Sequence, residues 1–338
     1  MVRTLSLAML ALCLVIAAGC GEGDNDAASS AATPAPRASV AAAATNQPTA
    51  TATAASSRPV LPVTVTDKDG RSVTVTDVSR IIPLNGDIAE VIWALGLGDN
   101  VIATDTSATY PEAATTLPKI GYQRQLSAEG VLSLNPTLVI GNEAAGPPAV
   151  IEQIRGAGVP VVILPSATTL DGAVEKIRAV AAALGVPERG GQIAAQTQTE
   201  IAAAQALAAT ATSKPRVAFL YVRGAATQQL GGKGTSADAL IAAAGGVDAG
   251  SEAGVQGFKP LTPEALVTAQ PDVLLLLMAG LESVGGVDGL LTLPGVAQTP
   301  AGKNRRVLDY DDQYLLGMGP RVGQALMDLV KGLHPELK

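Results

Sequence analysis

Gly121-Tyr122-Gln123-Arg124-Gln125-Leu126-Ser127-Ala128-Glu129-Gly130 is the stretch on which the fold assignment rests. Two apolar runs follow it, Val131–Leu134 and Leu138–Ile140, separated by Asn135-Pro136. Short apolar runs with a turn signal between them predict a short helix, a turn and a buried strand. The stretch therefore places a tyrosine, with an arginine two residues later, in a loop of a strand–helix unit.

The same alternation of strands and helices extends in both directions. On the N-terminal side, Leu61–Val78 predicts a β-hairpin and Arg80–Leu84 a buried strand, followed by a helix over Asp87–Leu97. On the C-terminal side, a second strand–helix series starts at Val217–Val222 and includes a strand at Val273–Leu277. The pattern predicts an α/β protein with two lobes, at residues 60–168 and 186–338, joined through residues 169–185.

Composition excludes several classes of protein. The chain has 338 residues, 47% of them hydrophobic and 16% charged, with a net charge of -7 and no basic block, which argues against a nucleic-acid partner. The cysteines are Cys13 and Cys20, and the one histidine is His334. A disulfide, a Cys/His zinc site and a Ser-His-Asp triad are therefore not expected in the folded part.

The N-terminus has the features of a targeting segment. Arg3 precedes the apolar stretch Leu5–Ala18, and Ile16-Ala17-Ala18-Gly19-Cys20 is similar to a lipobox. We expect residues 1–19 to be a lipoprotein signal peptide and Cys20 to be the lipidated residue, whose acyl chains would anchor the protein to a membrane. An ordinary secretory signal is the alternative. Residues 20–59 are rich in Ala, Thr, Ser and Pro, which predicts a disordered tether.

Two pairs of residues have the chemistry of an iron site. Tyrosinate is a hard ligand that suits Fe(III), and a guanidinium can hold a carboxylate, so Tyr122 and Arg124 are candidates in the first lobe. Tyr221 and Arg223 lie two residues apart at the end of a predicted strand, so both side chains share one face. Because ligands of open α/β sheets bind beyond the carboxyl ends of the strands, this second pair is also expected to reach a ligand.

From about Arg80 to Lys331 the chain resembles the haem-binding substrate-binding proteins of bacterial haem ABC importers. The resemblance implies a class III substrate-binding fold, with two Rossmann-like α/β lobes joined by a single long spanning helix, here Thr169–Leu184. It also implies that Tyr122 is an axial ligand of haem iron and Tyr221 a second one. Arg124 and Arg223 would then pair with haem propionates or hydrogen-bond the phenolates.

Other expected site residues also depend on this resemblance. Phe258 stands where the family often has tyrosine, and we expect it to pack on the porphyrin. Met318 is expected to contact the haem, and both Met278 and Met318 are weaker candidates than tyrosine for ligation of the iron. Glu90 and Glu264, one on a helix of each lobe, are expected to meet arginines of the permease; otherwise they are solvated helix residues.

The resulting prediction is a non-enzymatic, extracytoplasmic, lipid-anchored monomer on the outer face of the cytoplasmic membrane. It would bind haem, Fe(III) protoporphyrin IX, and deliver it to an ABC permease and its ATPase. A ferric siderophore or a cobalamin carried by the same fold is the alternative. A hydrolase or a zinc or manganese carrier is disfavoured, because the sequence offers no convincing carboxylate pair and too few histidines.

Overall fold

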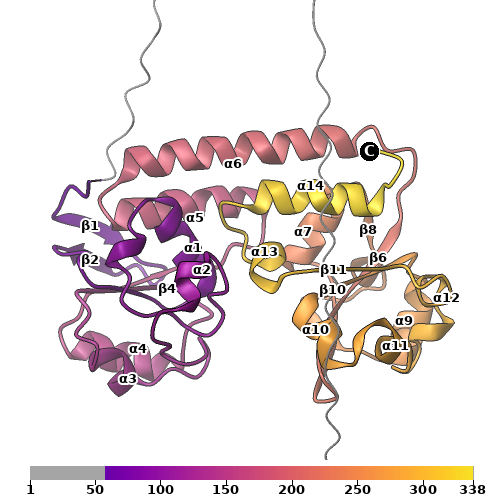
Figure 1. Cartoon of the computed structure of the whole chain (residues 1–338), viewed down its shortest axis with the longest axis horizontal. Helices are drawn as coiled ribbons and strands as arrows, with labels where there is room; N and C mark the ends of the chain where they lie inside the picture. The colour runs from indigo at the N-terminus through magenta and orange to yellow at the C-terminus, as the bar shows by residue number, and fades with distance from the viewer. Residues whose placement is uncertain (1–57, 338) are drawn as a thin grey trace, which may run out of the picture. The chain divides into compact units, whose positions relative to one another are not determined.

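The structure is a computed structural model and describes residues 58–337 (Figure 1). The predicted signal peptide, Cys20 and nearly all of the predicted tether lie outside the described residues. None of the helices in residues 58–337 has both the length and the apolar character needed to cross a bilayer.

A parallel sheet forms the centre of the N-terminal lobe. Its three strands are ordered β3–β4–β5, and every residue in them is buried, as expected for a parallel sheet that is covered on both faces. Val101 adds a single parallel bridge to Ile81 at the edge of this sheet. The elements of this sheet and its cover are β3 (Ile81–Pro83), α1 (Gly86–Ala94), η1 (Gly98–Asn100), α2 (Glu112–Thr115), α3 (Ala128–Leu132), β4 (Leu138–Asn142), α4 (Pro148–Gly156) and β5 (Val161–Leu164).

A β-hairpin precedes this sheet, as predicted. Its strands β1 (Val63–Thr66) and β2 (Ser72–Val75) pair antiparallel. The carboxylate of Asp67 accepts hydrogen bonds from the turn amides of Asp69 and Arg71, each at 2.9 Å. The same carboxylate pairs with Arg155 of α4 at 2.7 Å, which attaches the hairpin to the lobe.

Two consecutive helices carry the chain from the first lobe toward the second. Helix α5 (Leu170–Ala183) packs on α1, β1 and β5, whereas α6 (Pro187–Ala208) packs along both α5 and α14 (Val322–Leu333) (Figure 1). The prediction that the spanning helix is Thr169–Leu184 is therefore wrong. The 22-residue α6 has the greater length, about 33 Å at 1.5 Å per residue, and it contacts helices that belong to different lobes.

Two glycines explain how closely these helices pack. A Cβ atom at Gly190 of α6 would lie 2.2 Å from the Cβ of Ala181 in α5. A Cβ atom at Gly323 of α14 would lie 2.4 Å from the Cβ of Glu200 in α6. Neither separation is sterically possible, so the absence of a side chain at these positions permits the observed helix contacts.

A mixed sheet forms the centre of the C-terminal lobe. Its order is β11–β10–β6–β7–β9, with β8 paired to β6; β8, β10 and β11 run parallel to their neighbours, and β7 and β9 run antiparallel. The expected α/β class with two lobes is confirmed. The strands are β6 (Arg216–Arg223), β7 (Thr227–Gly231), β8 (Val247–Asp248), β9 (Phe258–Pro260), β10 (Val273–Leu277) and β11 (Val307–Tyr310). The helices are α7 (Ser236–Ala243), α8 (Ala249–Glu252), α9 (Pro263–Ala269), α10 (Met278–Ser283), α11 (Gly286–Leu291), η2 (Val296–Gln298), α12 (Pro300–Lys303), α13 (Asp312–Leu316) and α14 (Val322–Leu333).

Candidate haem-binding site

Tyr122 lies in an anchored loop between α2 and α3. Its side chain is 39% exposed, while the backbone around it is fixed by hydrogen bonds. Thr106 donates to the carbonyl of Gly121 at 2.9 Å, and Gly146 donates to the carbonyl of Gln123 at 2.8 Å. The loop thus presents a phenol to solvent from a fixed backbone, which lowers the entropic cost of forming a metal bond. Arg124, two residues on, is also exposed.

Tyr221 occupies the carboxyl end of β6 and is half-buried. The ring of Phe258 lies edge-on to it, with centroids 5.9 Å apart, and Phe258 itself is 41% exposed. Arg223 lies over the face of the tyrosine ring, 4.7 Å from its centroid. Alternation along the strand therefore does place the two side chains on one face, next to an exposed aromatic ring.

The partners of Arg223 differ from the expected ones. Its guanidinium donates to the carboxylate of Asp312 and to the carbonyl of Val222, the latter at 2.8 Å, and is not directed at the phenol oxygen. Burial raises the pKa of Asp312, and the positive charge of Arg223 acts in the opposite direction. Arg223 therefore packs on the ring of Tyr221 and pairs with Asp312 and with the carbonyl of Val222.

The two methionines occupy opposite environments. Met318 is 1% exposed and belongs to the main hydrophobic core, so the expected contact between Met318 and haem is wrong for this arrangement. Met278 is 44% exposed at the start of α10, directly after β10. Because β10 pairs with β6 in parallel, Met278 follows the strand next to the one that ends at Tyr221 and Arg223.

Glu90 does not lie on a solvated helix face. It is 3% exposed, and its carboxylate binds Arg321 in bidentate fashion, with both nitrogen–oxygen distances at 2.8 Å. Gln313 donates to the same carboxylate at 2.9 Å. A buried, fully paired carboxylate cannot meet an arginine of another protein without losing these partners, so the assignment of Glu90 to permease docking is corrected.

An internal repeat indicates a different residue for that role in the N-terminal lobe. Residues 121–140 and 257–275 share one sequence of features: a glycine with positive φ, an aromatic residue, a Ser or Thr that caps a short helix, a glutamate in its first turn, a left-handed residue, a proline and a buried strand. The matching residues are Gly121 and Gly257, Tyr122 and Phe258, Ser127 and Thr262, Glu129 and Glu264, Asn135 and Gln270, and Pro136 and Pro271.

Glu129 is the N-terminal counterpart of Glu264 in this repeat. Both are exposed, and each lies in the first turn of a helix whose capping hydroxyl accepts a backbone hydrogen bond, at 3.3 Å for Ser127 and 3.2 Å for Thr262. The sequence carried this signal, because both glutamates stand two residues after Ser or Thr and seven residues before Pro. It was missed because the repeat is short and only its glycine, one leucine (Leu126 and Leu261), its glutamate and its proline are identical.

Two pockets formed by described residues lie away from these side chains. One, of about 430 Å³, is lined by α5, α6 and α7, and another, of about 390 Å³, by α1, α6 and the segment around Arg321. Neither is lined by Tyr122, Tyr221 or Phe258. These two pockets are therefore separate from the candidate site.

Comparisons with known proteins agree with this architecture. The periplasmic heme-binding protein RhuT from Roseiflexus sp. RS-1, in apo form, is 58% identical, with a TM-score of 0.76 over 78% of this chain and 100% of that one. The heme-binding protein HmuT is 37% identical, with a TM-score of 0.78 over 83% and 93% of the two chains, and variants of HmuT with a histidine, an arginine or a tyrosine replaced by alanine match similarly. BhuT, solved in complex with two hemes, is 40% identical, with a TM-score of 0.71 over 77% of this chain and 99% of that one.

More distant relatives have other ligands in their names. A cobalamin-binding protein from Halobacterium salinarum is 26% identical over 280 residues, 81% of this chain and 74% of that protein. The uncharacterized ABC transporter substrate-binding lipoprotein YvrC from Bacillus subtilis is 25% identical over 283 residues, 82% and 87% of the two chains. The sequence profile of the periplasmic binding proteins matches residues 81–314. The chain therefore belongs to the periplasmic binding protein family.

Proposed function

We propose that this protein is an extracytoplasmic haem-binding protein that delivers haem to an ABC importer for iron acquisition. The observation that carries the proposal is the pair of accessible tyrosines, Tyr122 and Tyr221, one on each lobe. The sequence of this chain is 58% identical to that of a periplasmic heme-binding protein. Phenolate oxygen favours Fe(III), which is the oxidised form of haem found outside cells.

The spacing of these residues supports their assignment as iron ligands. In the HmuT variants, the replaced tyrosine and arginine are two residues apart, like Tyr221 and Arg223. The replaced histidine precedes that tyrosine by as many residues as Tyr122 precedes Tyr221. We assign Tyr122 as the dominant ligand, because it is the more exposed of the two and its loop backbone is fixed.

Neighbouring side chains complete the proposed site. Arg124 is exposed beside Tyr122 and supplies a cation for a haem propionate. Phe258 and Met278 are exposed near Tyr221 and offer apolar surface to the porphyrin. Arg223 holds the ring of Tyr221 in place while its guanidinium pairs with Asp312. A bound haem would compete with Asp312 for this guanidinium.

Delivery requires a surface for the permease and its ATPase, and we propose that Glu129 and Glu264 provide it. They are exposed, occur once per lobe and occupy equivalent places in the internal repeat. A lipid anchor at Cys20 would keep a monomer of this protein close to the permease, at the outer face of the cytoplasmic membrane.

Cobalamin is the competing ligand, because several relatives at 25–32% identity are named for cobalamin or vitamin B12. A ferric siderophore is a further candidate of the same fold. Haem gives a Soret band and charge-transfer bands characteristic of phenolate ligation. The cobalamin proposal predicts that cyanocobalamin competes with haemin for the site.

The test is a haemin titration of wild-type protein and of Tyr122→Phe, which keeps the ring and removes the oxygen. We expect the affinity to fall at least about tenfold, equivalent to about 1.4 kcal/mol, with a shift of the ferric charge-transfer bands. Tyr110→Phe is the matched control, because Tyr110 is 43% exposed and its ring is covered by Arg321. An unchanged spectrum and affinity in Tyr122→Phe would refute the ligand assignment.

A further inference from the structure

We infer that Asn85 and Lys176 are positioning residues, which hold the Tyr122 loop in a fixed position relative to the C-terminal segment at Gly317 through a continuous series of buried and half-buried polar contacts. The inference rests on the proposed role of Tyr122 as a haem ligand. None of the residues in this series of hydrogen bonds needs to touch the haem.

The chain starts beside the proposed ligand. The side-chain carbonyl of Gln123, the residue after Tyr122, accepts a hydrogen bond from the amide of Asn85. Asn85 is 1% exposed and stands at the N-terminal boundary of α1. Asparagine commonly caps a helix from this position, but here its side chain makes no capping bond, and the hydroxyl of Ser107 accepts from Gly86 at 3.1 Å instead. The side chain of Asn85 is therefore committed to the loop.

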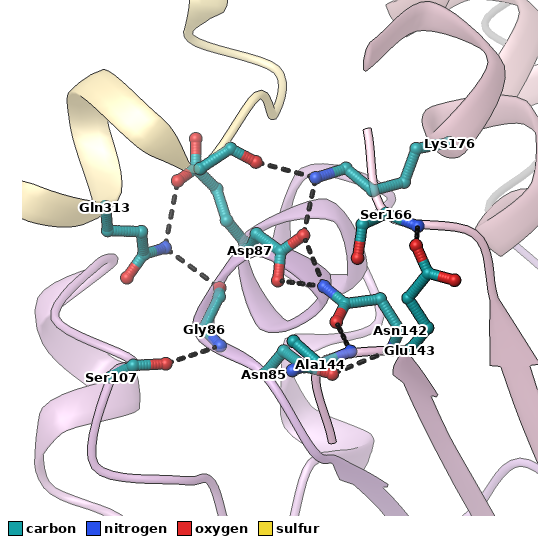
Figure 2. Close-up of polar contacts among 12 residues, drawn as sticks. Asn85, Gly86, Asp87, Ser107, Asn142, Glu143, Ala144, Ser166, Lys176 and Gln313 are labelled. Atoms are coloured by element: carbon teal, nitrogen blue, oxygen red, sulfur yellow. Dashed lines mark hydrogen bonds and ion pairs between the residues drawn. The ribbon is translucent and has the colours of Figure 1, made fainter. Parts of the chain in front are cut away.

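The next contacts cross the lobe to the end of β4. The Asn85 side-chain oxygen accepts from the backbone of Asn142 at 2.7 Å. The Asn142 side-chain amide then donates to both carboxylate oxygens of Asp87, at 3.2 and 3.1 Å (Figure 2). Asn142 is 7% exposed, so breaking these bonds would leave its buried polar atoms without partners.

Lys176 closes the chain. Its ammonium group donates at 2.6 Å to Oδ2 of Asp87, an oxygen that also accepts from Asn142 (Figure 2). It donates to the carbonyl of Gly317 at the same distance. Lys176 is 4% exposed, and burial of an ammonium group is costly unless it is paired. The charge thus fixes α5, the start of α1 and the C-terminal segment to one another.

Each contact in this series is a hydrogen bond or an ion pair, and its directionality restricts the relative positions of the two residues that it joins. A displacement at Gly317 changes the position of Lys176, and through Asp87, Asn142 and Asn85 it reaches the residue next to Tyr122. Gln313 makes a second connection in the same region, because it donates to the carbonyl of Gly86 at 2.9 Å. The described structure therefore provides a direct path from the C-terminal segment to the proposed iron ligand.

Three substitutions in the full-length protein test the first link. Gln123→Met keeps the size of the side chain and removes the acceptor, and we expect haemin to dissociate about tenfold faster with a broadened charge-transfer band. Gln123→Glu keeps an acceptor for Asn85 and should restore the wild-type rate. Gln125→Met makes the same chemical change at an exposed position of the same loop and should have no effect.

The second link is tested by a double-mutant cycle. Lys176→Met leaves Asp87 without its cation, so it is combined with Asp87→Asn, which removes both charges and protects folding. If the hydrogen bonds couple the two ends, the effects of Lys176→Met/Asp87→Asn and of Gln123→Met on haemin affinity should not be additive. The affinity of the combined variant should differ by at least about threefold from the value expected for additive effects. Additive effects would overturn the coupling, because distant and independent sites add.

Hydrogen exchange provides a readout that needs no haem. In both Gln123→Met and the Lys176→Met/Asp87→Asn protein, peptides containing Gly121 to Leu126 should exchange faster than in wild type, while peptides from β10 remain unchanged. If the exchange of this loop is unchanged in both variants while wild-type protein binds haemin normally, the inference is refuted and the proposed function is not. Failure of wild-type protein to bind haemin would instead refute the proposed function.

Discussion

Asp105→Asn should change how the stability of the protein depends on pH. Asp105 is fully buried, and its carboxylate accepts a hydrogen bond from the backbone of Ser107 at 3.0 Å. The other carboxylate oxygen, Oδ1, has no partner among the described residues. Burial, the largest cause, raises the pKa of Asp105 from 3.8 to about 6, against the opposing effect of the Ser107 hydrogen bonds.

The size of the effect follows from the two pKa values. In the unfolded chain Asp105 ionises near 3.8, and in the folded protein near 6, so the folded state holds its proton more tightly. This group therefore favours folding most when it is protonated, and the advantage is lost as the pH rises from about 4 through about 6. A difference of about two pKa units corresponds to about 3 kcal/mol.

The assay is urea unfolding followed by the fluorescence of Trp93, the single tryptophan, at several pH values between 4 and 7. The free energy of unfolding of Asp105→Asn minus that of wild type should rise by about 2–3 kcal/mol over this range. The constant cost of burying the new amide cancels in this comparison. Asp288→Asn, where the side chain is 86% exposed, controls for the loss of one charge.

A difference curve for Asp105→Asn that is flat, or that falls with rising pH, would refute the reasoning. The result also bears on the site, because Thr106, the next residue, donates to Gly121 in the Tyr122 loop. Acid conditions that protonate Asp105 should then leave that loop at least as stable as at neutral pH.

Three other outcomes are expected. Glu129→Lys combined with Glu264→Lys should leave haemin affinity within about twofold of wild type and abolish haem uptake through the cognate transporter; normal uptake would contradict the docking surface. Glu90→Gln should lower the free energy of unfolding by about 3 kcal/mol in urea, because Arg321 loses its buried partner, and a change below about 1 kcal/mol would show that the ion pair contributes little. Cys20→Ser should move the protein from the membrane fraction to the soluble fraction, and unchanged fractionation would contradict lipidation.

The sequence alone was enough for the class of fold and for the candidate iron ligands. The apolar runs that predicted buried strands at Leu138–Ile140 and Val273–Leu277 correspond to β4 and β10, because a strand covered on both faces needs a continuous apolar run. Tyr122 and Tyr221 were proposed as ligands from the resemblance to haem-binding substrate-binding proteins, and the scarcity of aromatic residues, 2% of this chain, drew attention to them.

Only the tertiary structure decided which polar residues are exposed. Glu90 and Glu264 were both predicted to lie on helices, but Glu90 is buried in an ion pair with Arg321, more than 200 residues away, whereas Glu264 is exposed to solvent. Met278 and Met318 likewise differ only in what packs on them. The spanning helix was misplaced for a related reason, since periodicity gives the length of a helix but not its neighbours, and α6 is defined by its contacts with α5 and α14. Local sequence determines which elements form, and long-range packing determines which of their side chains remain available to a ligand or partner.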